Sequence, residues 1–161
     1  MPQTQDTSMV DAANTLVGIS MIEAANTLVD ISQSSDFMLL FEKQLTESDV
    51  NQQQCRLVLP KLSVERYIIP HFTNEQKVRL RRESRLELRI HNIEDGVDHT
   101  FIFKWRRKGE LYALTSGWID FLRRRQLRYN DVVRFWWDQS HGRFCITTRH
   151  HADIVNRSLN S

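Results

Sequence analysis

Basic and amide side chains gather in two short stretches of the sequence, and both residue types bind nucleic acids. One stretch runs from Lys104 to Lys108 with the sequence KWRRK, between two segments rich in β-forming residues. The other runs from Asn51 to Arg56 with the sequence NQQQCR. Arginine and lysine grip phosphates or the edge of guanine, and asparagine and glutamine can form paired hydrogen bonds with adenine. Two nucleic-acid-binding loops are one interpretation, and solvated polar loop tips are the other.

Charge is distributed unevenly along the chain. Residues 1–50 hold eight acids and one base, a net charge of −7, which leaves 21 bases and 12 acids, a net charge of +9, for residues 51–161. A basic body behind an acidic segment indicates a polyanionic partner for the body. The alternative is a basic surface that faces only solvent. A separate basic cluster, from Arg79 to Arg85, is interpreted as part of a solvated connection, with phosphate contact or nuclear import as the alternatives.

Sequence patterns for catalysis, cofactors and metals are weak. His141, Cys145, His150 and His151 are candidate metal ligands, but structural zinc sites use four ligands in short paired spacings, and the sequence has no Cys-x-x-Cys. We find no phosphate-binding loop, dinucleotide fingerprint or nucleophile elbow. We therefore predict no cofactor, no metal site and no enzymatic activity. Cys55 and Cys145 are expected to be reduced thiols.

Short strands with turn signals between them are the elements that must position the two loops. Strands are expected over seven ranges: 37–45, 56–59, 86–91, 99–105, 111–114, 132–137 and 144–148. Helices are expected at 62–69 and from Trp118 to Arg125, while 73–85 is expected to be an exposed connection or a ragged strand. Trp136 and Trp137 are adjacent in a strand and must point to opposite faces. Regular short strands of this kind indicate a barrel or a sandwich.

Three motifs, in this order, resemble the plant-specific B3 DNA-binding domain. Residues 41–50 are similar to the opening strand and loop of that family, and the segment from Arg56 to Lys61, RLVLPK, is similar to its second strand. The third motif is a strand, corner, short helix and strand, matched here by Leu114, Thr115, Gly117, Trp118, Leu127, Asp131, Val133 and Phe135. The resemblance covers residues 37–149. It implies a mainly β fold, a seven-stranded open β-barrel (the DNA-binding pseudobarrel) with two short α-helices.

The resemblance also implies double-stranded DNA as the partner, with two loop arms that enter the major groove. The arms correspond to the two polar stretches. Carried over to this sequence, the DNA-binding residues are Asn51, Gln52, Gln53, Gln54, Arg56, Lys61, Lys104, Arg106, Arg107 and Lys108. The first arm departs from the best-studied pattern of the family, because it is one residue longer and contains no lysine. This departure bears on affinity and sequence preference rather than on the fold.

Three regions are expected along the chain. Residues 1–35 form an acidic leader, 36–149 the DNA-binding domain, and 150–161 a polar tail. The leader holds a tandem repeat, Met9–Ser20 and Met21–Ser32, in which nine of twelve positions are identical. A helix of that length is marginal alone, so a flexible leader is one interpretation and a helix that folds into the groove of a protein partner is the other. No signal peptide or membrane segment is recognised.

The predicted function is sequence-specific binding of double-stranded DNA, in a transcription factor that acts in the nucleus. The alternative is a degenerate domain of the same fold, which has lost DNA binding and acts as a protein-interaction module through its leader. A nuclease is disfavoured, because the sequence shows no cluster of acidic residues outside turns.

Overall fold

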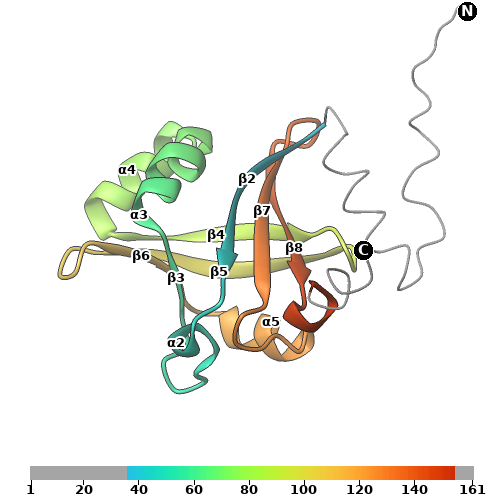
Figure 1. Cartoon of the computed structure of the whole chain (residues 1–161). Coiled ribbons are helices and arrows are strands. Elements are labelled where there is room, and N and C mark those ends of the chain that lie inside the picture. Colours follow the sequence, from blue (N-terminus) through green and yellow to red (C-terminus); the bar gives the residue numbers. More distant parts are fainter. Residues whose placement is uncertain (1–35, 155–161) are drawn as a thin grey trace, which may run out of the picture.

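One curled sheet forms the body of the protein (Figure 1). The computed structural model describes residues 36–154, so the leader with its repeat and the last seven residues of the tail lie outside the described residues. The strands are β2 (Phe37–Gln44), β3 (Leu57–Leu59), β4 (Arg85–Asn92), β5 (Val97–Arg106), β6 (Leu111–Leu114), β7 (Val132–Asp138) and β8 (Arg143–Arg149). They lie in the order β2-β7-β8-β4-β5-β6-β3. This open half-barrel, with β2 and β3 at its two ends, confirms the predicted fold class.

Hydrophobic alternation explains the long β4–β5 hairpin. In β4 the side chains of Leu86, Leu88 and Ile90 are buried, whereas the residues between them are exposed. The turn that follows contains the predicted Asp-Gly pair, with Gly96 in the left-handed region at φ 73°. β4 pairs antiparallel with β5 and parallel with β8, and every other neighbouring pair in the sheet is antiparallel.

Helical segments cover the ends of the half-barrel. Both predicted helices are present: the first is a short α-turn, α3 (Lys61–Ser63), that continues as a π-helical turn (Val64–Ile68) and a 3-10 turn (Ile69–His71). The second is α5 (Trp118–Arg124). A further short helix, α2 (Glu47–Val50), precedes the first polar loop. Residues 151–154 add a helical turn within the segment that was expected to be a polar tail.

The prediction for residues 73–85 is wrong, because this segment is mainly the helix α4 (Asn74–Glu83). Its start is a capping box, in which the Thr73 side chain accepts from the Gln76 backbone and the Gln76 side chain accepts from the Thr73 backbone. Its end is Ser84, in the left-handed conformation at φ 59°. Leu80 is the one buried residue of the helix. The apolar face of α4 is therefore too narrow to be recognised in a sequence segment rich in charged residues.

The core fills the inside of the curled sheet. Phe101 and Phe103 of β5 and Phe135 of β7 are buried there together with Trp118 of α5. The two neighbouring tryptophans of β7 point to opposite faces, as predicted. Trp137 packs against this core, whereas Trp136 is fully buried in a second cluster with Cys145 and donates to Thr147 Oγ1 at 2.9 Å.

Gly117, at the corner before α5, has no room for a side chain. Its φ is +94°, and a Cβ would lie 2.4 Å from the backbone oxygen of Thr100. We expect Gly117→Ala to lower the free energy of unfolding by roughly 2–4 kcal/mol, from backbone strain and the clash with a fixed carbonyl. Urea denaturation followed by tryptophan fluorescence measures this loss.

Gly96→Ala is the matched control for this substitution. Gly96 also has a positive φ, +73°, but a Cβ there meets nothing within 4 Å. Only the backbone strain remains, which amounts to about 1 kcal/mol. Equal losses in the two variants would show that the contact with Thr100 does not matter.

Candidate nucleic-acid interface

The first polar stretch forms a compact loop between α2 and β3, which we call arm 1 (residues 51–56). Asn51 holds the loop closed, because its side-chain Oδ1 accepts from the Gln53 backbone at 2.8 Å and its carbonyl accepts from the Gln54 backbone at 3.0 Å. Residues 51–55 are exposed and Arg56, at the base, is half-buried. Figure 1 shows the loop below the β4–β5 hairpin, next to α2.

Asp49 fixes the base of arm 1, although its side chain is fully buried. One carboxylate oxygen accepts from the backbone and hydroxyl of Thr46 at 2.8 and 2.9 Å, and the other accepts from the Val58 backbone at 3.1 Å. Lys43 Nζ lies 3.3 Å from the same carboxylate. The backbone oxygen of Asp49 accepts from the Trp118 indole at 2.7 Å. Both ends of arm 1 are therefore tied to the same buried group and to the core.

Not every amide of arm 1 is available to a ligand. Gln52 Oε1 accepts from Arg123 Nη2 at 2.6 Å, so this side chain joins arm 1 to α5. Gln53 and Gln54 are exposed, and among the described residues their side chains have no hydrogen-bond partner. Arg123 is not among the DNA-binding residues predicted from the sequence, and its position beside arm 1 depends on contact between residues 71 positions apart.

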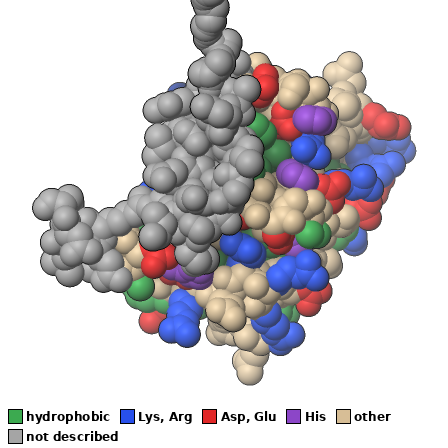
Figure 2. Space-filling model, turned by 90° about the vertical axis from the view of Figure 1, so that its right-hand side faces the viewer, with side chains coloured by type: hydrophobic (Ala, Val, Ile, Leu, Met, Phe, Trp, Pro, Cys, Tyr) green, Lys and Arg blue, Asp and Glu red, His purple; other side chains and the backbone are tan. Residues whose placement is uncertain are grey.

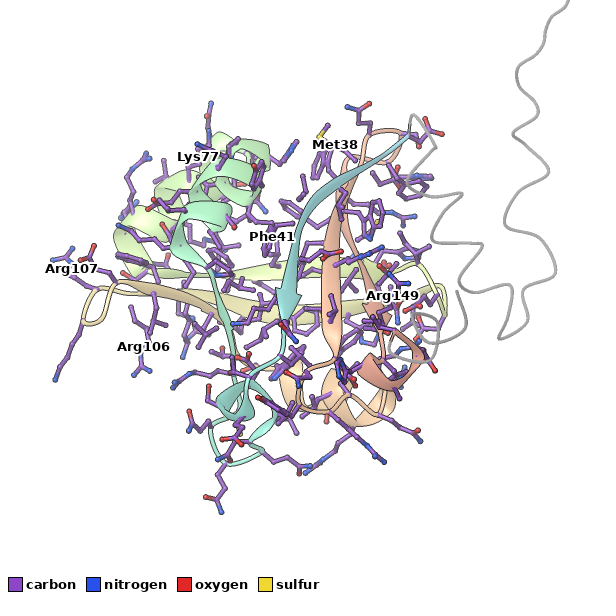
Figure 3. All side chains as sticks on the ribbon, in the orientation of Figure 1. Met38, Phe41, Lys77, Arg106, Arg107 and Arg149 are labelled. Atoms are coloured by element: carbon purple, nitrogen blue, oxygen red, sulfur yellow. The ribbon has the colours of Figure 1, made fainter. Side chains whose placement is uncertain are left out.

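The second polar stretch is the end of the β5–β6 hairpin, which we call arm 2 (residues 104–110). The hairpin is paired up to Arg106 and Leu111, so residues 107–110 form a tight turn. Figure 3 shows that Arg106 lies on the side of the hairpin where α2 and arm 1 are, while Arg107 lies on the opposite side, toward α4. The sequence analysis treated these arginines as a pair, and the structure separates them.

Alternation along β5 assigns a side to the other basic residues of arm 2. Lys104 is two residues before Arg106 and therefore shares its face of the strand. Lys108 is exposed in the turn. Glu110, also in the turn, accepts a hydrogen bond from Lys61 Nζ at 3.2 Å. This bond and the charge of Glu110 raise the pKa of Lys61, and they connect arm 2 to the start of α3.

The candidate metal ligands serve other roles in the described part of the chain. His141 Nδ1 lies 2.8 Å from Asp138, and His150 Nδ1 lies 3.0 Å from Asp131. Within residues 36–154 no group of three or more potential ligands is assembled. Cys145 is buried, which raises the pKa of its thiol to about 12, and both it and Cys55 are free.

Charges are mixed on the visible part of the face turned away from arm 2. Figure 2 shows the face that lies on the right in Figure 1, away from the tip of arm 2, and acidic and basic side chains alternate there. Between residues 36 and 154, no helix has the length and apolar character needed to cross a membrane.

Comparison of the sequence with protein-family models identifies the family of this chain. A family model described as the C-terminal domain of the B3 domain-containing protein At5g26805 matches residues 40–148. The chain belongs to the B3 domain family. The matched range contains both arms and part or all of every strand of this B3 domain. The family resemblance found in the sequence motifs is thus confirmed.

Relatives of this B3 domain are plant proteins. B3 domain-containing protein At2g36080 of Arabidopsis thaliana is 36% identical over 120 residues, which cover 74% of this chain and 47% of the relative. The AP2/ERF and B3 domain-containing transcription repressor TEM1 of the same species is 33% identical over 100 residues, which cover 60% of this chain and 27% of the relative. The chain therefore spans less than half of the length of these two relatives.

A solved structure of the family shares the fold. The Arabidopsis FUS3–DNA complex matches this B3 domain with a TM-score of 0.56 and 22% identity, and the match covers 70% of this chain and 97% of the other.

Proposed function

We propose that this B3 domain binds double-stranded DNA, with arms 1 and 2 in the major groove. The observation that carries the proposal is the placement of two polar loops on one curled sheet, with Arg106 facing the side of arm 1. A rigid β scaffold that presents basic and amide side chains on loops suits the reading of base edges. The DNA-bound form of FUS3, which has the same fold, supports the proposal.

Within the arms, exposure and existing contacts suggest a division of roles. Gln53, Gln54 and Arg106 are the side chains proposed to meet base edges, because they are exposed and their side chains make no hydrogen bond or ion pair within residues 36–154. Arg56, half-buried at the base of arm 1, is proposed to share this role. The cations proposed to hold phosphates are Lys61, Lys104, Lys108 and Arg123. Asn51 and Gln52 hold arm 1 in shape, and Arg107 contributes least because it faces α4.

The biological role that follows is regulation of transcription in the nucleus. Two observations support it: the family assignment and the relative that is a transcription repressor. Neither arm assembles the clustered carboxylates that a metal-dependent nuclease would use, since Glu110 is the one acid within residues 51–56 and 104–110.

Salt dependence tests DNA binding directly. Full-length protein should bind random duplexes, with log affinity falling against log salt at a slope of about −3 to −4, because each cation on a phosphate contributes about −0.9 through counterion release. Fluorescence anisotropy over a potassium chloride series measures the slope, with circular dichroism confirming that the protein is folded. Folded protein that fails to bind any duplex at low salt would instead support the protein-interaction module.

A further inference from the structure

A groove between α4 and arm 2 lies on the side of the hairpin away from arm 1. Its volume is about 320 Å³, and its apolar floor is made by Ile69, Leu80, Trp105 and Tyr112. The rings of Trp105 and Tyr112 lie 4.5 Å apart between centroids, which makes a continuous aromatic surface. A hollow of this size accommodates one or two aliphatic side chains of a peptide.

Three cations stand around this floor without acidic partners. Lys77 and Arg81 come from α4 and Arg107 comes from arm 2. None of the three is in an ion pair with any residue that the structure describes, and no described carboxylate lines the groove. The hydroxyl of Tyr112 already donates to Glu65 at 3.2 Å. The groove is therefore complementary to a segment that carries carboxylates next to aliphatic side chains.

We propose that this groove binds the acidic leader of the same chain, through the repeat unit Met21–Ser32. Residues 1–35 contain four acids and no lysine or arginine. The repeat unit places carboxylates directly beside aliphatic residues, at Ile22-Glu23 and at Val29-Asp30-Ile31. Aliphatic side chains cover the floor while Glu23 and Asp30 meet the cations. A DNA backbone has phosphates for the cations but no aliphatic group for the floor, so it fits the groove less well.

The leader is long enough to reach the groove. The described chain starts at Asp36, and β2 begins above the β4–β5 hairpin, on the side where α4 lies (Figure 1). Met38 of β2 pairs with Trp137, whose ring stacks on His71 at 4.2 Å, and Ile69 of the groove is two residues before His71. Glu23 is 13 residues before Asp36, and an extended chain of that length spans roughly 45 Å.

Carbodiimide crosslinking of the full-length protein tests this proposal, because the reagent joins an amine to a carboxylate in contact with it. We expect an amide between Lys77 Nζ and Glu23 or Asp30, identified by mass spectrometry.

Replacing the two other groove cations, in the variant Arg81→Gln/Arg107→Gln, should lower the yield of this crosslink about fivefold, since loss of exposed ion pairs changes an equilibrium by about that factor. The matched control is Arg79→Gln/Arg82→Gln, which removes equal charge from the opposite side of α4 and should leave the yield unchanged.

Three outcomes would overturn the proposal. Leader carboxylates that couple to Lys61, Lys104 and Lys108 as often as to Lys77 would show general attraction to basic residues. Crosslinks between ¹⁴N- and ¹⁵N-labelled copies would identify a second copy as the source of the bound leader. If no Lys77 crosslink forms and Arg81→Gln/Arg107→Gln weakens duplex binding more than its control, the groove holds DNA phosphates instead. The crosslinking readouts do not require that the arms bind DNA, so the proposal can fail or succeed independently of the proposed function.

Discussion

Replacing Arg106 with alanine is expected to weaken binding to a selected DNA site by about 5- to 150-fold, the equivalent of roughly 1–3 kcal/mol for one lost contact to a base edge. The neighbouring substitution Arg107→Ala removes the same charge from the same hairpin. It should cost much less, because Arg107 lies on the side of α4 whereas Arg106 lies on the side of arm 1 (Figure 3).

Sequence preference distinguishes the two arginines more sharply than affinity does. A site is first selected from random duplexes with the full-length protein. Anisotropy titrations then compare each variant on that site and on a scrambled duplex. Arg106→Ala should bind the two duplexes more equally than wild-type protein, while Arg107→Ala should keep the wild-type ratio. If Arg107→Ala removes the preference and Arg106→Ala retains it, arm 2 meets DNA with its other side.

Asp49→Ala is expected to lower the free energy of unfolding by about 3 kcal/mol or more. The buried carboxylate satisfies the backbone N–H groups of Thr46 and Val58, and its loss leaves both without a partner beside the unpaired Lys43. Urea denaturation gives the stability difference. The comparison variant is Asp98→Ala, whose carboxylate pairs with His91 at an exposed site, and its loss of stability should be much smaller than that of Asp49→Ala.

Arm 1 should also lose its shape in Asp49→Ala. Under conditions where the variant is still folded, we expect weaker DNA binding than in wild-type protein. The amides of arm 1 that are proposed to enter the major groove of DNA would no longer be held in one arrangement. A variant with reduced stability and unchanged DNA affinity would show that arm 1 keeps its shape without the carboxylate, or that it does not touch DNA.

Local sequence signals predicted most of the strands. The alternation of Leu86, Leu88 and Ile90 identifies β4, and Asp95-Gly96 identifies its turn, because both features depend only on neighbouring residues. A local signal is also present for α4, in the Thr73–Gln76 capping box, but apolar periodicity cannot reveal a helix with one buried residue.

The geometry of the candidate site was less accessible to sequence reasoning. Asp49 looks like an ordinary turn residue, yet its backbone oxygen accepts a hydrogen bond from the indole of Trp118, which is 69 positions away. The contact between Lys61 and Glu110 and the one between Gln52 and Arg123 also join distant parts of the chain. By contrast, strand alternation alone could have separated Arg106 from Arg107, because successive residues at the end of a strand face opposite sides.

The order of strands in the sheet has a consequence for synthesis on the ribosome. β2 is made first, yet its one neighbour in the sheet is β7, and the β2–β7 pair joins the remaining strands through β8, which is made last. Until Arg143–Arg149 has emerged, the nascent chain can close the β4–β5–β6–β3 part of the sheet but not the half-barrel. The first strand must therefore wait with unsatisfied backbone groups and exposed apolar side chains, so folding of the complete domain is expected to be slow and to finish only after β8 has left the ribosome.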